Sequence, residues 1–242
     1  MTLREKVAIV TGASQGIGEA TALKLAEAGG HLMLTARNQE KLSALADKIN
    51  ASGHAQALYT PADTCKPDDV EKVVHNTLAN FGQIDILINN AGVAGKIALL
   101  QEISLEEIDR IIDTNLKGAI YWIRSVLPAM VAQQGGIIVN MNSIAGKTAY
   151  PYWSIYDASK FGLDAITTAV REEQRRNNIK VIGIYPGTVD TPIWETIEMG
   201  SEPDRSGMLH ADDIANAIVY ALQQPNKTLV EEITLAPLNP AL

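Results

Sequence analysis

The stretch "VAIVTGASQGIG", residues 7–18, decides the fold. A short β-branched run, 7–11, leads directly into a loop that contains Gly12, Gly16 and Gly18, and a helical pattern follows. Glycine allows a tight turn and a close approach of backbone to a pyrophosphate, and the amino terminus of the next helix faces that anion. A glycine triplet alone also fits a purely structural turn, but the strand-loop-helix order is the context that a dinucleotide site requires. We therefore expect this loop to bind cofactor phosphates.

The alternation of strand and helix continues along the whole chain. Strand-helix-strand units form right-handed crossovers, so the pattern predicts an α/β fold with a doubly wound parallel sheet of seven strands and helices on both faces. Ligands of such sheets bind at the carboxyl ends of the strands. Strands are expected at 7–11, 31–35, 55–60, 84–89, 136–141, 180–185 and 228–235. Helices are expected at about 16–29, 39–52, 67–81, 105–134, 155–177 and 211–223.

Length and composition limit the classes of protein that this chain can be. Its 242 residues, 46% hydrophobic and 20% charged, predict one dinucleotide-binding catalytic domain over 1–242. The net charge of −8, with no run of basic residues, argues against a nucleic-acid surface or an anionic membrane surface. The longest apolar stretches are strand-sized, far shorter than a membrane span.

The cysteine and histidine content points to a reducing compartment and a metal-free mechanism. Cys65 is the only cysteine, so no intramolecular disulfide can form. A strand-like run begins almost at the amino terminus and leaves no room for a signal peptide, so we expect a cytoplasmic protein. The four histidines are scattered without metal-ligand spacing, and no metal site is expected. They are His31, His54, His75 and His210.

Two further segments are informative. In "SIYDASK", residues 154–160, Tyr156 precedes Lys160 by four positions and would share its helical face. Such pairs are common by accident, but an adjacent ammonium would favour the phenolate and lower the tyrosine pKa from its usual value of about 10. The irregular segment 190–210, "DTPIWETIEMGSEPDRSGMLH", is long enough to predict a substrate lid.

Six motifs, taken together, resemble one family. They are "TGASQGIG" at 11–18, "NNAG" at 89–92, Asn115 in "DTNLKG", Ser143 in "NMNSIAG", "YDASK" at 156–160 and "PGTVDT" at 186–191. In order and spacing, the chain resembles the short-chain dehydrogenases/reductases of the single-domain type of about 250 residues. The resemblance implies a Rossmann-type fold, a nicotinamide cofactor and interconversion of a carbonyl compound with an alcohol by hydride transfer.

The same resemblance implies four catalytic roles. Tyr156 would be the general acid/base on the substrate oxygen, and Lys160 would also bind the nicotinamide ribose. Ser143 would hydrogen-bond the substrate oxygen, and Asn115 would anchor a water that connects Lys160 to solvent. Each could instead be an ordinary polar residue, with Asn115 at a helix kink and Ser143 in a turn.

The cofactor would be bound by residues from several motifs. Asp63 would accept from the adenine amino group with Thr64 beside it, although Asp63 could equally cap a helix. "NNAG" would line the path between adenosine and nicotinamide or form only a turn, while Val189 and Thr191 would contact the carboxamide. The expected cofactor-binding residues are Gly12, Ser14, Gln15, Gly16, Ile17, Gly18, Arg37, Asn38, Asp63, Thr64, Asn90, Ala91, Gly92, Tyr156, Lys160, Pro186, Gly187, Val189 and Thr191.

The end of the second strand favours NADP(H) over NAD(H). An acidic residue there would bind the adenosine ribose hydroxyls, but the sequence has Ala36 followed by Arg37. A guanidinium can hold a 2′-phosphate bidentately, with Ser14 and Asn38 as further donors. The alternative is a solvated arginine that begins the next helix. Many NADP-preferring relatives also carry a basic residue within the glycine loop, where this chain has Gln15.

The substrate is a small molecule whose identity the sequence leaves open. The expected pocket wall is apolar or aromatic, without a partner for phosphate or carboxylate, although Trp153 could instead pack between subunits. Tails like this one favour a hydroxy acid or a general carbonyl compound over a 3-oxoacyl thioester. A dinucleotide-binding sensor without turnover and an epimerase or dehydratase are the rival functions. The candidate wall residues are Ile144, Tyr150, Tyr152, Trp153, Ile193, Trp194 and Met199.

Two helices are apolar over more of their circumference than one sheet face requires. In 105–134 and 155–177, a second apolar face would be buried by a two-fold partner presenting the same helices. Relatives dimerise through these helices and form tetramers through the last helix and strand. We expect a homo-oligomer, a tetramer in preference to a dimer.

Overall fold

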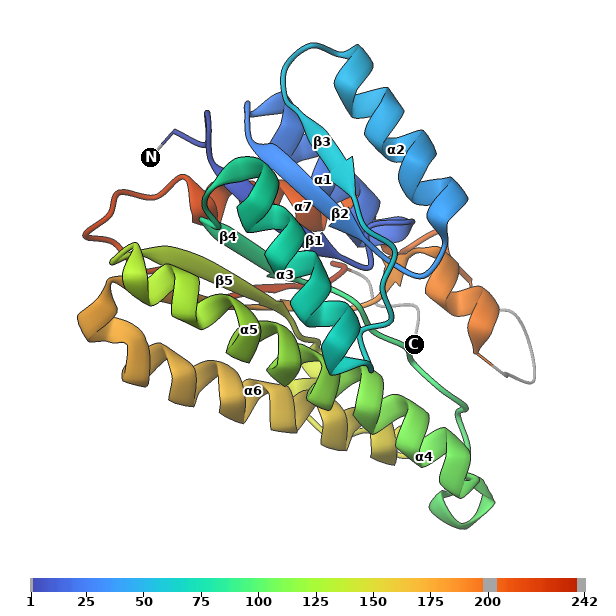
Figure 1. Ribbon diagram of the computed structural model, residues 1–242. Helices are drawn as coiled ribbons and strands as arrows, with labels where there is room; N and C mark the ends of the chain where they lie inside the picture. The colour runs from blue at the N-terminus through green and yellow to red at the C-terminus, as the bar shows by residue number, and fades with distance from the viewer. Residues whose placement is uncertain (1, 198–203, 239–242) are drawn as a thin grey trace.

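The computed structural model describes residues 2–197 and 204–238. Its main sheet has seven strands in the order β3-β2-β1-β4-β5-β6-β9, and every neighbouring pair is parallel (Figure 1). The predicted seven-stranded parallel sheet is therefore confirmed. Its strands are β1 Val7–Thr11, β2 His31–Thr35, β3 Ala57–Tyr59, β4 Ile86–Asn89, β5 Gly136–Met141, β6 Ile179–Pro186 and β9 Glu232–Leu235.

Helices cover both faces of this sheet. In Figure 1, α3, α5 and α6 lie in front of the strands, and α1 and α7 lie behind them. Consecutive residues of β1 reach both cores: Ile9 packs on the α3 and α5 side, and its neighbours Ala8 and Val10 pack on the α1 and α7 side. The helices are α1 Gly16–Glu27, α2 Gln39–Ala51, α3 Pro67–Phe81, α4 Leu105–Ile112, α5 Ala119–Ala132, α6 Ser154–Gln174 and α7 Ala211–Leu222.

The chain is helical from Leu105 to Ala132, close to the predicted 105–134, but it is not α-helical throughout. Between α4 and α5 lies one π-helical stretch, η2 Asp113–Gly118. The Asn115 side chain within it is hydrogen-bonded to the backbone of Val93 in the loop after β4. Apolar spacing could not reveal this, because the apolar positions continue through the stretch.

Strand and helix ends differ from prediction by a few residues. The strands expected at 55–60 and 84–89 are shorter in the structure, and the last strand begins at Glu232 rather than 228. Before β9 the Lys180 ammonium of β6 donates to the carbonyl oxygen of Thr228 at 2.6 Å. Helix α3 begins at Pro67, as predicted, and the Ser104 hydroxyl caps α4 by accepting from the Glu107 N–H.

Part of the segment 190–210 is ordered by a second, smaller sheet. Strand β7 Val189–Asp190 pairs in parallel with β8 Leu209–His210, and η5 Pro192–Thr196 follows β7. Sequence patterns did not predict this pairing, because two-residue strands carry no periodicity. Within 2–197 and 204–238, no helix is long and apolar enough to cross a membrane.

Candidate active site

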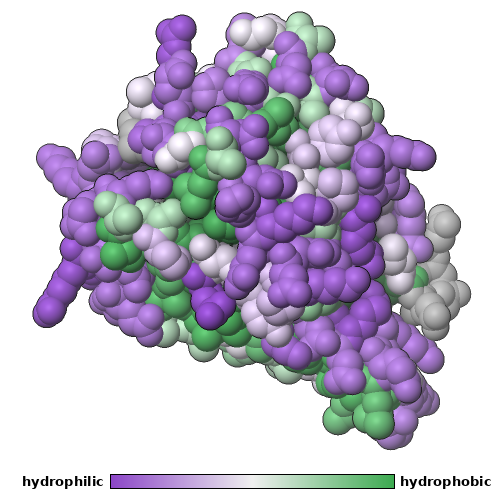
Figure 2. All heavy atoms as spheres, in the orientation of Figure 1, coloured by the Kyte–Doolittle hydropathy of each residue, from purple (hydrophilic) through white to green (hydrophobic). Residues whose placement is uncertain are grey.

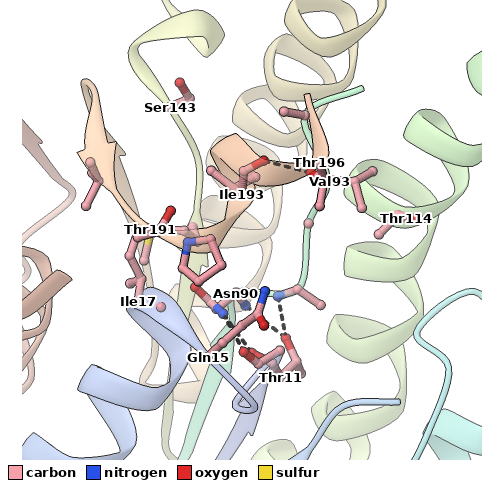
Figure 3. A pocket seen from close by; sticks show the side chains of 18 of the residues that line it. Thr11, Gln15, Ile17, Asn90, Val93, Thr114, Ser143, Thr191, Ile193 and Thr196 are labelled. Carbon is pink, nitrogen blue, oxygen red and sulfur yellow. Dashed lines mark hydrogen bonds between the residues drawn. The ribbon is translucent and has the colours of Figure 1, made fainter. Parts of the chain in front are cut away.

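A cavity of about 1040 Å³ opens at the carboxyl ends of the sheet strands. Residues at and after the ends of all six strands from β1 to β6 line it, together with the first turns of α6, part of η5, and residues of α4 and η2. Figure 3 shows the glycine loop and Asn90 on one side and Ser143 on another, with Ile193 and Thr191 between them. This is the edge at which a parallel sheet binds its ligands.

The glycine loop is shaped by close backbone contacts. Gly12 and Gly16 have φ of +62° and +60°, a region that favours glycine. A Cβ at Gly18 would lie 2.3 Å from the Gly12 carbonyl oxygen, so helix α1 can approach the loop only with glycine there. Gly18 is not among the residues that line the cavity, and its predicted contact with the cofactor stays a prediction. Gly12, Ser14, Gln15, Gly16 and Ile17 do line it.

The "NNAG" segment is bound to the end of β1. The Thr11 hydroxyl accepts from the backbone N–H groups of Asn90 and Ala91, both at 2.9 Å (Figure 3). The Asn90 amide donates back to the Thr11 carbonyl oxygen at 3.0 Å. Asn90, Ala91 and Gly92 therefore form a fixed cavity wall as well as a turn.

Polar residues that follow β2 and β3 also line the cavity. Arg37 and Asn38 line the cavity, and the Asn38 side chain also caps α2 by accepting from the Lys41 N–H at 2.9 Å. Asp63 lines it too, although its carboxylate accepts from the Cys65 N–H at 3.0 Å in a local turn.

Thr64 lines the same cavity wall beside Asp63. Its hydroxyl accepts from the Trp122 indole N–H at 2.7 Å, which anchors the wall to α5. Both predicted residues are thus placed at the cavity, and each also has a structural hydrogen bond of its own.

Tyr156, Lys160 and Ser143 line one end of this cavity. Tyr156 and Lys160 lie one turn apart on α6, and the Lys160 nitrogen is 5.6 Å from the centre of the Tyr156 ring. Lys160 is 5% exposed and donates to the Met141 carbonyl oxygen at 2.9 Å. Ser143 begins the short helix η3 Ile144–Gly146 and accepts from the Ala145 N–H at 3.1 Å.

The pKa values of this pair follow burial rather than their mutual charge. Burial raises the pKa of Tyr156 to about 12; the Ser143 hydroxyl opposes the rise and the Asp157 carboxylate adds to it. Burial also lowers the pKa of Lys160 to about 8. The expectation that Lys160 lowers the Tyr156 pKa is therefore wrong for this structure, because desolvation of both groups is the larger effect.

Asn115 is buried at 1% exposure and does not line the cavity. Its carbonyl oxygen accepts from the Val93 N–H, and its amide donates to the Val93 carbonyl and to the Ser159 hydroxyl at 3.1 Å. The side chain thus connects the loop after β4 to α6 through the π-helical stretch. Its predicted contact with a water near Lys160 stays a prediction.

The segment "PGTVDT" forms the wall opposite the glycine loop. Pro186, Gly187, Val189 and Thr191 all line the cavity, as expected. Thr191 lies near the glycine loop (Figure 3). A Cβ added at Gly16 would be 3.3 Å from the Cβ of Thr191.

Three buried polar atoms at the cavity have no hydrogen-bond partner in the described protein. They are the hydroxyls of Thr35 and Thr188 and the amide nitrogen of Asn142. Unpartnered buried polar groups at a cavity fit a polar ligand that would satisfy them. The donor set, the shaped glycine loop and these free groups suit a dinucleotide. None of the three was predicted, because threonine and asparagine at strand ends carry no distinctive spacing.

The end of the cavity at Ser143 and Tyr156, the predicted substrate end, has a largely apolar wall. Ile144, Tyr150, Trp153, Ile193 and Trp194 line it as predicted. The Trp153 and Tyr156 rings meet edge to face with centres 5.6 Å apart. The Trp194 indole N–H is already bonded to the Val189 carbonyl oxygen at 2.8 Å, so Trp194 offers an apolar surface.

The two other predicted wall residues are Tyr152 and Met199. Tyr152 does not line the cavity; its side chain is 55% exposed, which corrects the prediction. Met199 lies outside the described residues.

Comparison with known proteins places the chain in a family. The family model for short chain dehydrogenases matches residues 6–201. An uncharacterized oxidoreductase of Staphylococcus epidermidis is 36% identical over 237 residues, which cover 97% of this chain and 98% of the relative.

Two solved structures are also similar. An alcohol dehydrogenase from the archaeon Thermococcus sibiricus, complexed with 5-hydroxy-NADP, has a TM-score of 0.89 and 30% identity, covering 96% of this chain and 97% of that one. A metagenomic short-chain oxidoreductase in complex with NADP has a TM-score of 0.85 and 33% identity, covering 99% and 100%. This chain belongs to the short-chain dehydrogenase/reductase family of oxidoreductases.

Proposed function

We propose that the protein is an NADP(H)-dependent oxidoreductase that interconverts a neutral ketone or aldehyde with an alcohol. The observation that carries this proposal is the meeting of Ser143, Tyr156 and Lys160 with the glycine loop in one cavity. A protein that only senses a dinucleotide has little need for these three side chains together at one end of the cavity.

The roles of the residues follow from their positions. Bound at the glycine loop, the nicotinamide cofactor supplies or accepts the hydride. Ser143 holds the substrate oxygen, and Tyr156 gives that oxygen a proton in reduction and takes it in oxidation. Lys160, fixed by the Met141 carbonyl, places its ammonium beside the tyrosine and the cofactor ribose.

NADP(H) is preferred over NAD(H) because of the charge at the end of β2. Arg37 lines the cavity there, and no carboxylate lies within 4.0 Å of its guanidinium among the residues that the structure describes. The two similar solved structures that are complexed with NADP or its 5-hydroxy form support the same preference.

The apolar substrate end favours a neutral carbonyl compound over a hydroxy acid. Among the described residues that line the cavity, the cations other than Arg37 and Lys41 are Lys160, which is buried against the backbone, and Arg110, whose guanidinium is already paired with the Glu107 carboxylate at 2.6 Å. A substrate carboxylate there would lose its hydration without a charged partner. Ile193, Trp194 and Ile197, from the first part of the predicted lid, line this end.

The proposed assembly is a homotetramer of single-domain chains in the cytoplasm. On α6 the Phe161 ring is 42% exposed, and Leu105 at the start of α4 is 75% exposed. Figure 2 shows apolar residues gathered at the end of the molecule below α4. Light scattering coupled to size exclusion tests the assembly, and a mass near the 26.1 kDa of one chain would contradict it.

The test of function is a panel of carbonyl compounds followed through the absorbance of reduced nicotinamide. We expect turnover of neutral ketones with NADPH, and faster reduction of ethyl phenylglyoxylate than of the phenylglyoxylate anion, which shares its ketone. Intact cofactor binding without turnover on a broad panel would instead favour a dinucleotide sensor.

A further inference from the structure

A second cation lies at the same end of the cavity as Arg37. It comes from α2, not from the glycine loop, where many NADP-preferring relatives carry their basic residue. Lys41, on the first turn of α2, lines the cavity together with Ser14, Gln15 and Arg37. Its ammonium donates to the side-chain oxygen of Gln15 at 2.9 Å. Gln15 occupies the position at which the glycine loop lacks a basic residue, so Lys41 brings a positive charge to that position from the opposite side.

Glu40 is the acidic residue in the first turn of α2, but it is not within ion-pair distance of either cation at this end of the cavity. Helix α1 begins directly after Gln15, and α2 begins directly after Asn38, so two positive helix ends converge here. A lysine in the first turn of a helix is unfavourable unless an anion compensates it. Among the described residues, neither Arg37 nor Lys41 has a carboxylate within 4.0 Å.

A buried polar group at the same strand end also points to a ligand. Thr35, the last residue of β2, is 2% exposed, and its hydroxyl has no hydrogen-bond partner in the described protein. It lines the cavity two residues before Arg37. An unpartnered hydroxyl in the same cavity as two cations without carboxylate partners suits a ligand that carries both hydroxyl and phosphate oxygens.

We propose that Lys41 is a second ligand of the 2′-phosphate of NADP(H) and sets the cofactor specificity together with Arg37. This inference rests on the proposed NADP(H) preference and adds a residue to it. Gln15 holds the flexible lysine side chain across the gap between the glycine loop and α2. The phosphate would then lie between a guanidinium from the end of β2 and an ammonium from the first turn of α2.

The test measures binding without turnover, using two nucleotides that differ in one phosphate. Dissociation constants of 2′,5′-ADP and 5′-AMP are determined by calorimetry for the wild type, Lys41→Gln, Lys41→Arg and Lys48→Gln. Lys48 is an exposed lysine on the same helix that does not line the cavity, so its variant is the matched control. Thermal unfolding of each variant verifies that the fold is kept.

We expect Lys41→Gln to weaken 2′,5′-ADP about tenfold, the lower end for a hydrogen bond to a charged group, and to leave 5′-AMP unchanged. Lys41→Arg should retain most of the affinity, and Lys48→Gln all of it. Added salt should reduce the wild-type preference for 2′,5′-ADP more than that of the variant.

Two results would overturn the proposal in distinguishable ways. A wild type that prefers 2′,5′-ADP, with a Lys41→Gln variant that binds it equally well, would remove Lys41 from the site and leave the proposed function intact. A wild type that binds both nucleotides equally would overturn this inference together with the NADP(H) preference.

Discussion

The two ends of the cavity are built from different materials. The proposed cofactor end consists largely of backbone and short polar side chains, such as Gly12, Gly16 and Thr11, whose positions are fixed by hydrogen bonds or by the lack of a Cβ, together with the cations Arg37 and Lys41. The substrate end consists of large apolar side chains from η3, the start of α6 and η5, among them Trp153 and Trp194. Backbone geometry therefore restricts which residue types can occupy the cofactor end, whereas the substrate end requires only side chains that fill an apolar volume. The difference explains why the cofactor class can be inferred with detail and the substrate only as a chemical class.

The largest effect on turnover is expected from removing the proposed proton donor, Tyr156, which lies between the two ends. Tyr156→Phe keeps the ring and its edge-to-face contact with Trp153 but deletes the hydroxyl. We expect turnover to fall by roughly 10²–10⁴-fold, the usual worth of a general acid or base, while cofactor affinity changes little. Steady-state kinetics and cofactor titration measure the two quantities. A variant that keeps more than about a tenth of the wild-type rate would show that Tyr156 is not the acid/base.

The direction of the Tyr156 pKa shift makes a linked prediction for wild-type kinetics. A phenol with a pKa of about 12 is protonated at neutral pH and is ready to donate in reduction. Oxidation of the alcohol requires the phenolate, so its kcat/KM should rise as pH increases, whereas reduction should not. A profile for oxidation that stays flat between about pH 6 and 9 would argue against a tyrosine base in this environment.

The buried charge of Lys160 should lower the free energy of unfolding of the protein, and Lys160→Met measures by how much. The folded protein releases the Lys160 proton near pH 8, but the unfolded chain keeps it to about pH 10.4, so the stability of the wild type rises with pH across this interval. Lys160→Met removes the buried charge and should raise the free energy of unfolding at pH 7 by up to about 3 kcal/mol. The gain should vanish above about pH 10. Turnover and cofactor binding should both be damaged.

Urea unfolding of the wild type and of Lys160→Met at pH 7 and pH 10.5 measures the effect. Comparing the two proteins at each pH cancels the other groups that titrate in both. Equal stability differences at the two pH values would mean that Lys160 carries no charge penalty in the free protein.

At the cofactor end, Arg37→Asp should reverse the cofactor preference. The change removes a phosphate partner and adds a repelling charge, so the ratio of kcat/KM with NADPH to that with NADH should fall by at least about tenfold. Measuring both cofactors with the same substrate provides the ratio. If the ratio does not move, Arg37 is a solvated residue before α2.

How much was predictable also follows the contrast between the two ends. Glycine spacing, the Tyr156–Lys160 interval and apolar periodicity predicted the parallel sheet and the residues that line most of the cavity, because each encodes a local geometric requirement. Lys41 and Thr188 were missed, since their roles depend on which side chains meet across the cavity. The π-helical stretch was missed because the Val93–Asn115 contact joins residues far apart in the sequence. The Tyr156 pKa was predicted in the wrong direction because burial cannot be read from helical spacing.

The smallest expected effect concerns the substrate wall. Trp153 lines the cavity and meets the Tyr156 ring edge to face, whereas the adjacent Tyr152 is 55% exposed and does not line it. Trp153→Ala should lower kcat/KM for ethyl phenylglyoxylate by roughly 2–10-fold, the worth of one aromatic contact, and should affect a small ketone such as butanone less. Tyr152→Ala, the matched control, should leave both unchanged. If Trp153→Ala lowered both substrates equally, the tryptophan would position Tyr156 rather than select the substrate, and the substrate end would be as geometrically restricted as the cofactor end.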